Sequence, residues 1–302
     1  MRIYRLLMAI LLVSALLFSF AGCTQPTEDP SSPPENPTTE STSPSETVTD
    51  PTETNPTEPK IGWVEENGKR YYYSETGEML TGWLGEGENW YYLKEDGSMA
   101  VGKTEVEGET LYFGPDGLQF LLVNPWTFMP EGYKPEVVDI NGWQFSSVEC
   151  IDELNEMLDA CRAAGLVPYI ASAFRTHSDQ IVLHNNKIQR LIKEGYSEAD
   201  AKRLAGTVVA VPGTSEHELG LAFDLVDNSY RNLDEAQENT AVQKWLMENS
   251  WKYGFILRYP SSKSEITGII YEPWHYRFVG KVMAKEIYDS GLCLEEYIET
   301  LG

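Results

Sequence analysis

The sequence predicts an α+β domain with a small antiparallel sheet, preceded by a solenoid of about three β-hairpins. Two observations carry this prediction. An aromatic-rich pattern recurs every twenty residues between positions 61 and 120, and helical segments flank short apolar strand segments between positions 121 and 302. With a leader and a proline-rich stretch before them, the 302 residues divide into four regions, 1–23, 24–60, 61–120 and 121–302.

Residues 1–23 have the features of a secretory leader. Arg2 and Arg5 precede an apolar run from Leu6 to Phe20, which is shorter than the roughly 20 residues of a membrane span. The segment Phe20-Ala21-Gly22-Cys23 resembles the lipobox of bacterial lipoproteins. That resemblance implies lipidation of Cys23 and anchoring on the extracellular face of the cytoplasmic membrane; the alternative is a plain secretory signal. Either reading places the protein outside the cytoplasm.

Residues 24–60 predict a disordered tether. This stretch holds nine of the seventeen prolines, many Thr and Ser, eight acidic residues and almost nothing apolar to bury. At about 3.1 Å per residue it would reach on the order of 100 Å into a cell wall. The whole chain carries 23 Lys and Arg against 47 Asp and Glu, a net charge of −24, which excludes nucleic acid as a partner.

The repeat begins with Gly62-Trp63 and returns as Gly82-Trp83 and Gly102-Lys103. Each copy contains an aromatic strand closed by an acidic turn ending in glycine, a pattern typical of stacked β-hairpins. The strands are expected at 71–73, 90–92 and 111–113, and the turns at 75–77, 95–97 and 115–117.

The pattern is similar to the cell-wall-binding repeats of choline-binding and glucan-binding proteins. This resemblance implies that aromatic side chains, here Trp63, Trp83, Trp90 and Tyr91, bind quaternary ammonium groups or sugars. Arg70 and Lys103 stand where the family pattern favours tryptophan. A spacer whose aromatic residues form only its own core is the alternative.

Residues 121–302 read as helices around short strands. A capping box at Ser146–Glu149 is expected to open a helix that ends at Gly165, and Ser178 and Ser197 are expected to cap two more. The remaining expectations are strands at 167–174, 221–226, 255–259 and 269–278, a helix at 240–253 and helices after Gly280. Cys150, Cys161 and Cys293 are expected to be mainly buried thiols; whether Cys293 pairs with one of the others stays open.

One dense motif runs from Ser215 to Asp224, SEHELGLAFD. Along the predicted strand Phe223 faces the core, so Asp224 projects the other way. Gly220 allows the chain to turn so that His217 folds back over the same face. A buried, unpaired aspartate would be costly, and a metal ion removes that cost.

A second motif is Glu272-Pro273-Trp274-His275. Residues three apart on a regular strand point to opposite faces, but Pro273 favours an edge or bulge. Such a bend would bring Glu272 and His275 to one site.

His217, Asp224 and His275 supply three protein ligands and leave a fourth position for water, which is the arrangement of a catalytic zinc site. Glu272 is then the candidate base. Arg175, at the exposed end of a predicted strand, suits binding of a terminal carboxylate or a developing oxyanion.

The three motifs SAFR, SEHELGLAFD and EPWHYR together resemble the zinc D-alanyl-D-alanine carboxypeptidases of the VanY type, which are related to dipeptidases and L,D-carboxypeptidases. The resemblance implies hydrolysis of the terminal D-alanine of peptidoglycan stem peptides, one zinc ion, and zinc ligation by the three residues above, with Glu272 as base and Arg175 on substrate. Gln180, Ser215 and Trp274 are further candidates for substrate contact.

Other polar residues near these motifs are interpreted as ordinary. His177, His184, Arg258 and Arg277 are expected at the surface. Glu216 and Glu218 flank His217 and are alternatives to Glu272 as base, but neighbours of a ligand are expected to point away from the metal. The alternative functions are an L,D-carboxypeptidase, an endopeptidase on peptidoglycan, a non-catalytic wall-binding lipoprotein and, last, a non-haem iron oxygenase.

Overall fold

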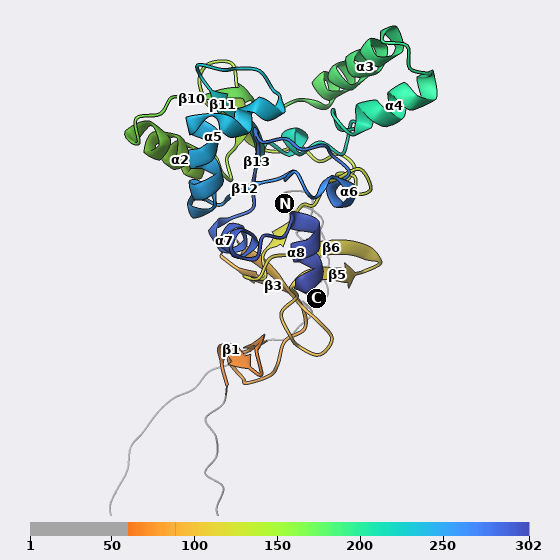
Figure 1. The fold of residues 1–302 in the computed structure, drawn as a ribbon. Helices are drawn as coiled ribbons and strands as arrows, with labels where there is room; N and C mark the ends of the chain where they lie inside the picture. The colour runs from red at the N-terminus through yellow and green to blue at the C-terminus, as the bar shows by residue number, and fades with distance from the viewer. Residues whose placement is uncertain (1–59, 88, 302) are drawn as a thin grey trace, which may run out of the picture. The chain divides into compact units, whose positions relative to one another are not determined.

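The structure is a computed structural model that describes residues 60–87 and 89–301, and residues 59–302 form one compact unit (Figure 1). The predicted leader with Cys23, and residues 24–59 of the predicted linker, lie outside the described residues. Among the described residues, no helix is both long enough and apolar enough to cross a membrane.

Three β-hairpins form the N-terminal part, as the twenty-residue period predicts. Asn67 and Gly68 turn the first hairpin with φ of 52° and 74°, the positive values that two-residue hairpin turns require. The paired strands are β1 Gly62–Glu66 with β2 Lys69–Tyr73, β3 Gly82–Glu86 with β4 Asn89–Leu93, and β5 Gly102–Val106 with β6 Glu109–Phe113, which also pairs with β7 Gln119–Phe120.

The same contact recurs between successive hairpins. The side chain of Met79 lies against Gly97, where an added Cβ would come within 2.3 Å of the Met79 sulfur. Met99 lies against Gly117 in the same way, at 2.4 Å. Each turn glycine therefore has two reasons to be glycine, its positive φ and the methionine packed on it.

The C-terminal part is built on a four-stranded antiparallel sheet, which confirms the predicted α+β architecture. The strand order is β10-β11-β13-β12. These strands are β10 Pro168–Ser172, β11 Ala222–Asp227, β12 Phe255–Leu257 and β13 His275–Phe278, and a separate ribbon pairs β8 Val137–Asp139 with β9 Phe145–Ser147.

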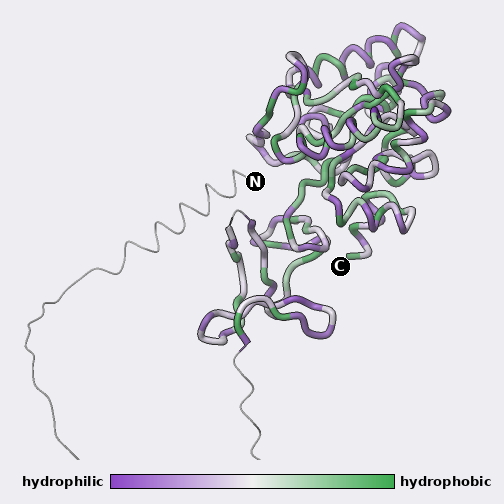
Figure 2. The backbone as a smooth tube through the Cα atoms, turned by 90° about the vertical axis from the view of Figure 1, so that its left-hand side faces the viewer, coloured by the Kyte–Doolittle hydropathy of each residue, from purple (hydrophilic) through white to green (hydrophobic). Residues whose placement is uncertain are grey.

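Two helices, α2 Ile151–Ala163 and α5 Ala241–Asn249, contribute to the main apolar core, which includes one face of this sheet. Figure 2 shows hydrophobic segments running through the middle of this part of the chain. The core joins residues of both helices to residues of β11, β12 and β13: Leu154, Met157, Leu158, Cys161, Val242, Leu246, Phe223, Leu225, Phe255 and Tyr276. Burial of this face leaves the opposite face of the sheet for polar side chains.

The remaining helices lie around this centre. Helices α3 His177–Lys193 and α4 Glu198–Gly206 pack on each other through Ile188, Leu191, Ala201 and Ala205. The other elements are α6 Ser264–Thr267, α7 Lys281–Ser290, α8 Leu294–Thr300 and the 3-10 turns η1 Glu216–Leu219, η2 Glu235–Asn239 and η3 Ser250–Tyr253.

A second apolar cluster joins the third hairpin to the C-terminal helices. Tyr112 and Phe120 pack against a buried group that includes Met283 of α7 and Tyr297 of α8. The third hairpin therefore shares a core with residues that follow position 121.

Several expected boundaries are wrong. Ser146 and Ser147 belong to β9, so the predicted capping box does not form and helix α2 begins at Ile151 without a side-chain cap. Helix α3 is capped by Thr176 rather than by Ser178, because Thr176 and Asp179 form the capping box, whereas Ser197 caps α4 as predicted. Strand β13 begins only at His275. Cys150, Cys161 and Cys293 are buried and free.

Candidate metal centre

The sheet register brings two of the predicted ligands together. Asp224 of β11 lies directly opposite His275 of β13, and opposed residues on paired strands share a face. The neighbouring pair, Phe223 opposite Tyr276, points the other way into the apolar core. Alternation along both strands therefore places the carboxylate and the imidazole on the polar face.

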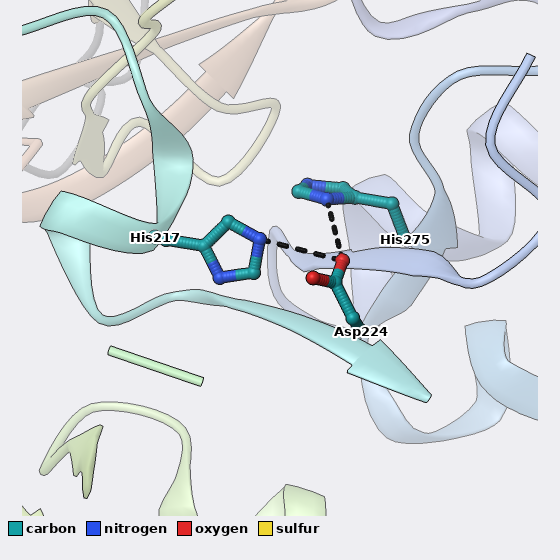
Figure 3. A group of neighbouring side chains, drawn as sticks. All are labelled: His217, Asp224 and His275. Atoms are coloured by element: carbon teal, nitrogen blue, oxygen red, sulfur yellow. Dashed lines mark hydrogen bonds and ion pairs between the residues drawn. The ribbon is translucent and has the colours of Figure 1, made fainter. Parts of the chain in front are cut away.

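His217 reaches the same place from the 3-10 turn η1. Gly220 ends this turn with φ of 71°, and only Leu221 separates it from β11. His217 Nδ1 donates a hydrogen bond to the Ala173 carbonyl oxygen at 2.8 Å, so its Nε2 has a free lone pair that points at Asp224 Oδ1, 3.4 Å away. Figure 3 shows both imidazoles directed at the Asp224 carboxylate.

His275 presents its other nitrogen to the centre. Its Nδ1 lies 3.2 Å from Asp224 Oδ1 and its Nε2 lies 3.3 Å from Glu216 Oε2. The three residues are buried, and their candidate ligand atoms lie within 4.8 Å of one another.

These positions fit a tetrahedral cation. Donor atoms about 2.0–2.1 Å from a zinc ion lie about 3.3 Å from one another, and the two separations from Asp224 Oδ1 are 3.2 and 3.4 Å. Two imidazole nitrogens and one carboxylate oxygen are also the donor set of catalytic zinc sites, in which a fourth position stays open.

Glu272 stands beside the three candidate ligands because of a tight turn. The His275 amide donates to the Glu272 carbonyl at 3.1 Å, which closes a turn with Pro273 in its second position. This turn is the bend that the sequence predicts. It places Glu272 Oε2 3.7 Å from His275 Nδ1.

Burial and neighbouring charges shift the pKa values of the centre in different directions. Burial raises the pKa of Glu272 to about 8, with Asp224 adding to the rise and His275 opposing it. Burial lowers the pKa of His217 to about 4, and Arg175 contributes. Burial also acts on His275, but its hydrogen bonds to Asp224 and Glu216 outweigh this effect and raise its pKa to about 9. Burial opposes ionisation of Asp224, yet His217, His275 and Arg175 hold its pKa well below the usual range.

Arg175 lies at the edge of the centre, with its side chain 20% exposed. Its Nη2 donates to Asp224 Oδ2 at 3.0 Å, and its Nε donates to Ser172 Oγ at 3.0 Å. Gln180 is fully buried; its Oε1 accepts from Arg175 Nη1 at 3.3 Å, and its Nε2 donates to the Ala210 carbonyl. Gln180 therefore holds Arg175, and its contact with substrate stays a prediction.

Two further candidates flank the ligands. Ser215 is buried and immediately precedes η1. Trp274 is buried within the turn before His275, and its carbonyl accepts from the Leu225 amide at 2.8 Å. Their contact with substrate stays a prediction.

Sequence reasoning missed a group of buried charges behind His275. Arg258 and Arg277, expected at the surface, are 0% and 1% exposed and both bind Glu216, which also is buried. The two arginines outweigh burial and hold the pKa of Glu216 well below its usual range. One signal was available, because Arg277 is two residues beyond His275 and therefore shares its face of β13.

The two remaining histidines support loops near the centre. His177 is exposed as expected, with Nδ1 2.7 Å from Glu218 Oε2. His184 was expected at the surface, but it is only 9% exposed, because its Nδ1 donates to the Val209 carbonyl at 2.8 Å. His184 and Gln180 lie one helical turn apart on α3. They donate hydrogen bonds to the carbonyl oxygens of the consecutive residues Val209 and Ala210, which precede the turn that carries His217.

The predicted repeat-binding aromatics mostly contact other rings of the hairpins. Trp63 makes edge contacts with Tyr72 and Tyr91 at centroid distances of 5.2 and 5.0 Å. The Arg70 guanidinium lies 4.4 Å from the Trp63 ring centroid. Trp83 contacts Tyr92 and Phe113, and Trp90 lies across Gly85, where an added Cβ would meet its ring at 3.1 Å.

Comparison with known families gives two matches. Residues 145–281 match VanY, the D-alanyl-D-alanine carboxypeptidase family, and residues 60–103 match a choline-binding repeat.

Individual relatives match between 59% and 66% of the chain. A D-alanyl-D-alanine carboxypeptidase of Enterococcus faecalis is 43% identical over 180 residues, which is 60% of this chain and 65% of that protein. The chain therefore spans just under two thirds of that relative. A vancomycin resistance D,D-pentapeptidase VanY, solved as a mutant in complex with Zn(II), is 42% identical with a TM-score of 0.54, covering 59% of this chain and 97% of the other. The LdcB LD-carboxypeptidase is 35% identical with a TM-score of 0.55, covering 66% and 94%.

Proposed function

The chain belongs to the VanY family of D-alanyl-D-alanine carboxypeptidases, and we propose that it is a zinc carboxypeptidase that removes the terminal D-alanine from peptidoglycan stem peptides. One observation carries the proposal. His217 Nε2, His275 Nδ1 and Asp224 Oδ1 converge on one buried point, and the Glu272 carboxylate stands beside them.

The three ligands would hold zinc, which when bound supplies Lewis acidity and lowers the pKa of a coordinated water molecule to about 7. Glu272 is the group that takes the proton from the attacking water and delivers it to the departing amine. Without a cation the pKa of Glu272 is about 8. A positive charge held by the neighbouring ligands lowers that value, because it favours the carboxylate.

Arg175 supports the assignment to a carboxypeptidase. Its guanidinium is partly exposed at the edge of the centre and is fixed by Ser172 and Gln180. A fixed guanidinium suits a terminal carboxylate, since it offers paired donors in one plane. A substrate bound this way has room for a single residue beyond the scissile bond.

A second candidate is L,D-carboxypeptidase activity on tetrapeptide stems. The likeness to the LdcB LD-carboxypeptidase favours it. The TM-score with that enzyme is 0.55, and the TM-score with the D,D-pentapeptidase is 0.54. The metal centre and Glu272 would serve both reactions. The two candidates differ only in the stem peptide that they accept.

The same proposal places the enzyme outside the cell membrane. The leader motif ending at Cys23 supports a lipid anchor, and the proline-rich stretch after it supports a tether. The hairpins, which match a choline-binding repeat, would contact choline or glycan in the wall.

The test is release of free D-alanine by residues 59–302 from a pentapeptide stem ending in D-Ala-D-Ala. We expect one D-alanine per stem, loss of activity with a chelator and recovery with zinc. Glu272→Gln should lower kcat by roughly 10²–10⁴-fold while zinc stays bound. Release from a tetrapeptide stem alone would assign the L,D reaction, and no release from either stem by the zinc-loaded protein would refute carboxypeptidase activity.

A further inference from the structure

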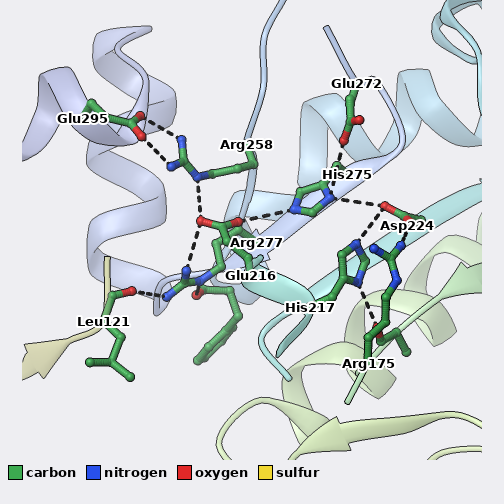
Figure 4. Close-up of polar contacts among 12 residues, drawn as sticks. Leu121, Arg175, Glu216, His217, Asp224, Arg258, Glu272, His275, Arg277 and Glu295 are labelled. Carbon is green, nitrogen blue, oxygen red and sulfur yellow. Dashed lines mark hydrogen bonds and ion pairs between the residues drawn. The ribbon is translucent and has the colours of Figure 1, made fainter. Parts of the chain in front are cut away.

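Glu216 is next to the proposed ligand His217 in sequence, yet its side chain contacts the other proposed histidine ligand, His275. Its Oε2 lies 3.3 Å from His275 Nε2, and its side chain is completely buried. Figure 4 shows Glu216 behind His275, on the side away from Asp224 and Glu272. We propose that Glu216 is a positioning residue that holds His275 in the orientation and tautomer that bind the metal ion.

The tautomer matters because His275 lies between two carboxylates. Its Nδ1, the nitrogen that faces the proposed metal, also lies 3.2 Å from Asp224 Oδ1. A carboxylate there draws the ring proton to Nδ1, which leaves no lone pair for a metal. Glu216 offers a competing acceptor at Nε2, so that the remaining proton resides on Nε2 and Nδ1 is free.

Two buried arginines fix the Glu216 carboxylate in place. Arg258 Nε donates to Glu216 Oε1 at 2.7 Å, and Arg277 Nη1 donates to the same oxygen at 3.1 Å. Both guanidiniums therefore use Oε1 and leave Oε2 for His275. Both guanidiniums also pair with the Glu216 carboxylate as ion pairs, and hydrogen bonds between charged groups are shorter and stronger than neutral ones.

The series of ion pairs that begins at Glu216 ends on the C-terminal helix. Arg258 Nη1 and Nη2 donate to the two oxygens of Glu295 on α8 at 2.8 and 2.6 Å. Asn124 donates to Glu295 Oε1 at 3.2 Å. Glu295 thus contacts Arg258 and Asn124 but not His275, and it lies on α8 at the C-terminal end of the described chain.

Glu295 supplies a control, because Glu216 and Glu295 are carboxylate partners of the same buried arginine and only Glu216 contacts a proposed ligand. The proposal rests on the proposed zinc site, so zinc affinity of the full-length protein is measured first, by competition with a chromophoric chelator. For the wild type, Glu216→Gln and Glu295→Gln we compare zinc affinity, thermal unfolding without metal, and long-range ¹H–¹⁵N NMR of His275 in the zinc-loaded state.

Both variants should unfold at lower temperature than the wild type, since each removes one carboxylate partner of the buried Arg258. Glu216→Gln should weaken zinc binding by roughly 10–100-fold, and Glu295→Gln by less than about threefold. The wild-type spectrum should place the His275 proton on Nε2, and this signal should shift only in Glu216→Gln.

If Glu216→Gln does not fold, the pair Glu216→Gln with Arg277→Gln removes one buried charge of each sign, and Arg277→Gln alone is its reference. Equal zinc affinities in Glu216→Gln and Glu295→Gln, or in the double variant and its reference, would overturn the proposal. Failure of the wild type to bind zinc would instead refute the metal site itself.

Discussion

At the scale of single residues, two chemically identical carboxyl groups at the candidate metal centre differ in pKa because their surroundings differ. Glu216 and Glu272 are both buried within reach of His275, yet their pKa values move in opposite directions. Two guanidiniums face Glu216 and keep it charged. Glu272 faces Asp224 with fewer compensating charges, so burial dominates and favours its protonated form.

The raised pKa of Glu272 predicts a cost in stability for the metal-free protein. Below its ordinary pKa of 4.5 the group is protonated in both the folded and unfolded states and contributes nothing. Between 4.5 and about 8 only the folded state keeps the proton, so the free energy of unfolding falls as the pH rises. Glu272→Gln removes this fall and should stabilise the metal-free protein by roughly 2–4 kcal/mol at pH 8 but not at pH 4.

Thermal unfolding with excess chelator at pH 4, 6 and 8 measures this difference. Equal unfolding temperatures of the variant and the wild type at pH 8 would contradict the desolvation argument. If Glu272→Gln both loses turnover and stabilises the metal-free protein, the buried Glu272 carboxyl serves activity and lowers the free energy of unfolding.

At the scale of elements, the sheet and the hairpins both depend on which side chain lies opposite which. The register of β11 and β13 pairs Asp224 with His275 and leaves Phe223 and Tyr276 for the core. In the first hairpin, a side-chain contact covers an aromatic ring that could otherwise bind a ligand. Arg70 covers the face of Trp63, and an aromatic face that already holds a cation is less available to a quaternary ammonium ligand.

This contact predicts weak choline binding by the first hairpin and a gain on removing the arginine. An exposed cation–π contact contributes about 0.5–1 kcal/mol, so Arg70→Ala should tighten choline binding by about two- to fivefold. Tryptophan fluorescence during choline titration is the measurement. Lys103→Ala, which removes an exposed cation of the third hairpin at the repeat position of Trp63 and Trp83, is the control and should have no effect. Identical choline affinities of Arg70→Ala and the wild type would show that Trp63 is not a ligand face.

At the scale of the whole molecule, the third hairpin differs from the first two. Its Tyr112 and the following Phe120 share an apolar cluster with Met283 and Tyr297 of the C-terminal helices. Helix α8 also carries Glu295, which fixes Arg258 behind the metal centre. The hairpins and the catalytic part are therefore connected by packing as well as by the chain.

Shortened chains test how much the third hairpin stabilises the C-terminal part. Compared with residues 60–302, a chain of residues 101–302 should keep the unfolding temperature of the catalytic part within a few degrees. A chain of residues 121–302 should unfold roughly 5–10 °C lower, because it loses about 2 kcal/mol or more of aromatic packing on α7 and α8. Calorimetry of the three chains measures this, and equal unfolding temperatures for the two shorter chains would show that the cluster contributes little.

The sequence by itself determined the hairpin repeat, the α+β class and the residues that the structure gathers at the candidate metal centre, because these follow from local order. The twenty-residue period repeats along one continuous stretch, and the strand alternation around Asp224 and the proline two positions before His275 are readable within a few residues. Only the tertiary structure decided where the buried charges go. Glu216 lies between Arg258, Arg277 and His275, which are 42 to 61 positions away. A charged residue is buried only when distant partners compensate it, and no local pattern identifies those partners. For the same reason His184 and the two arginines were expected in solvent.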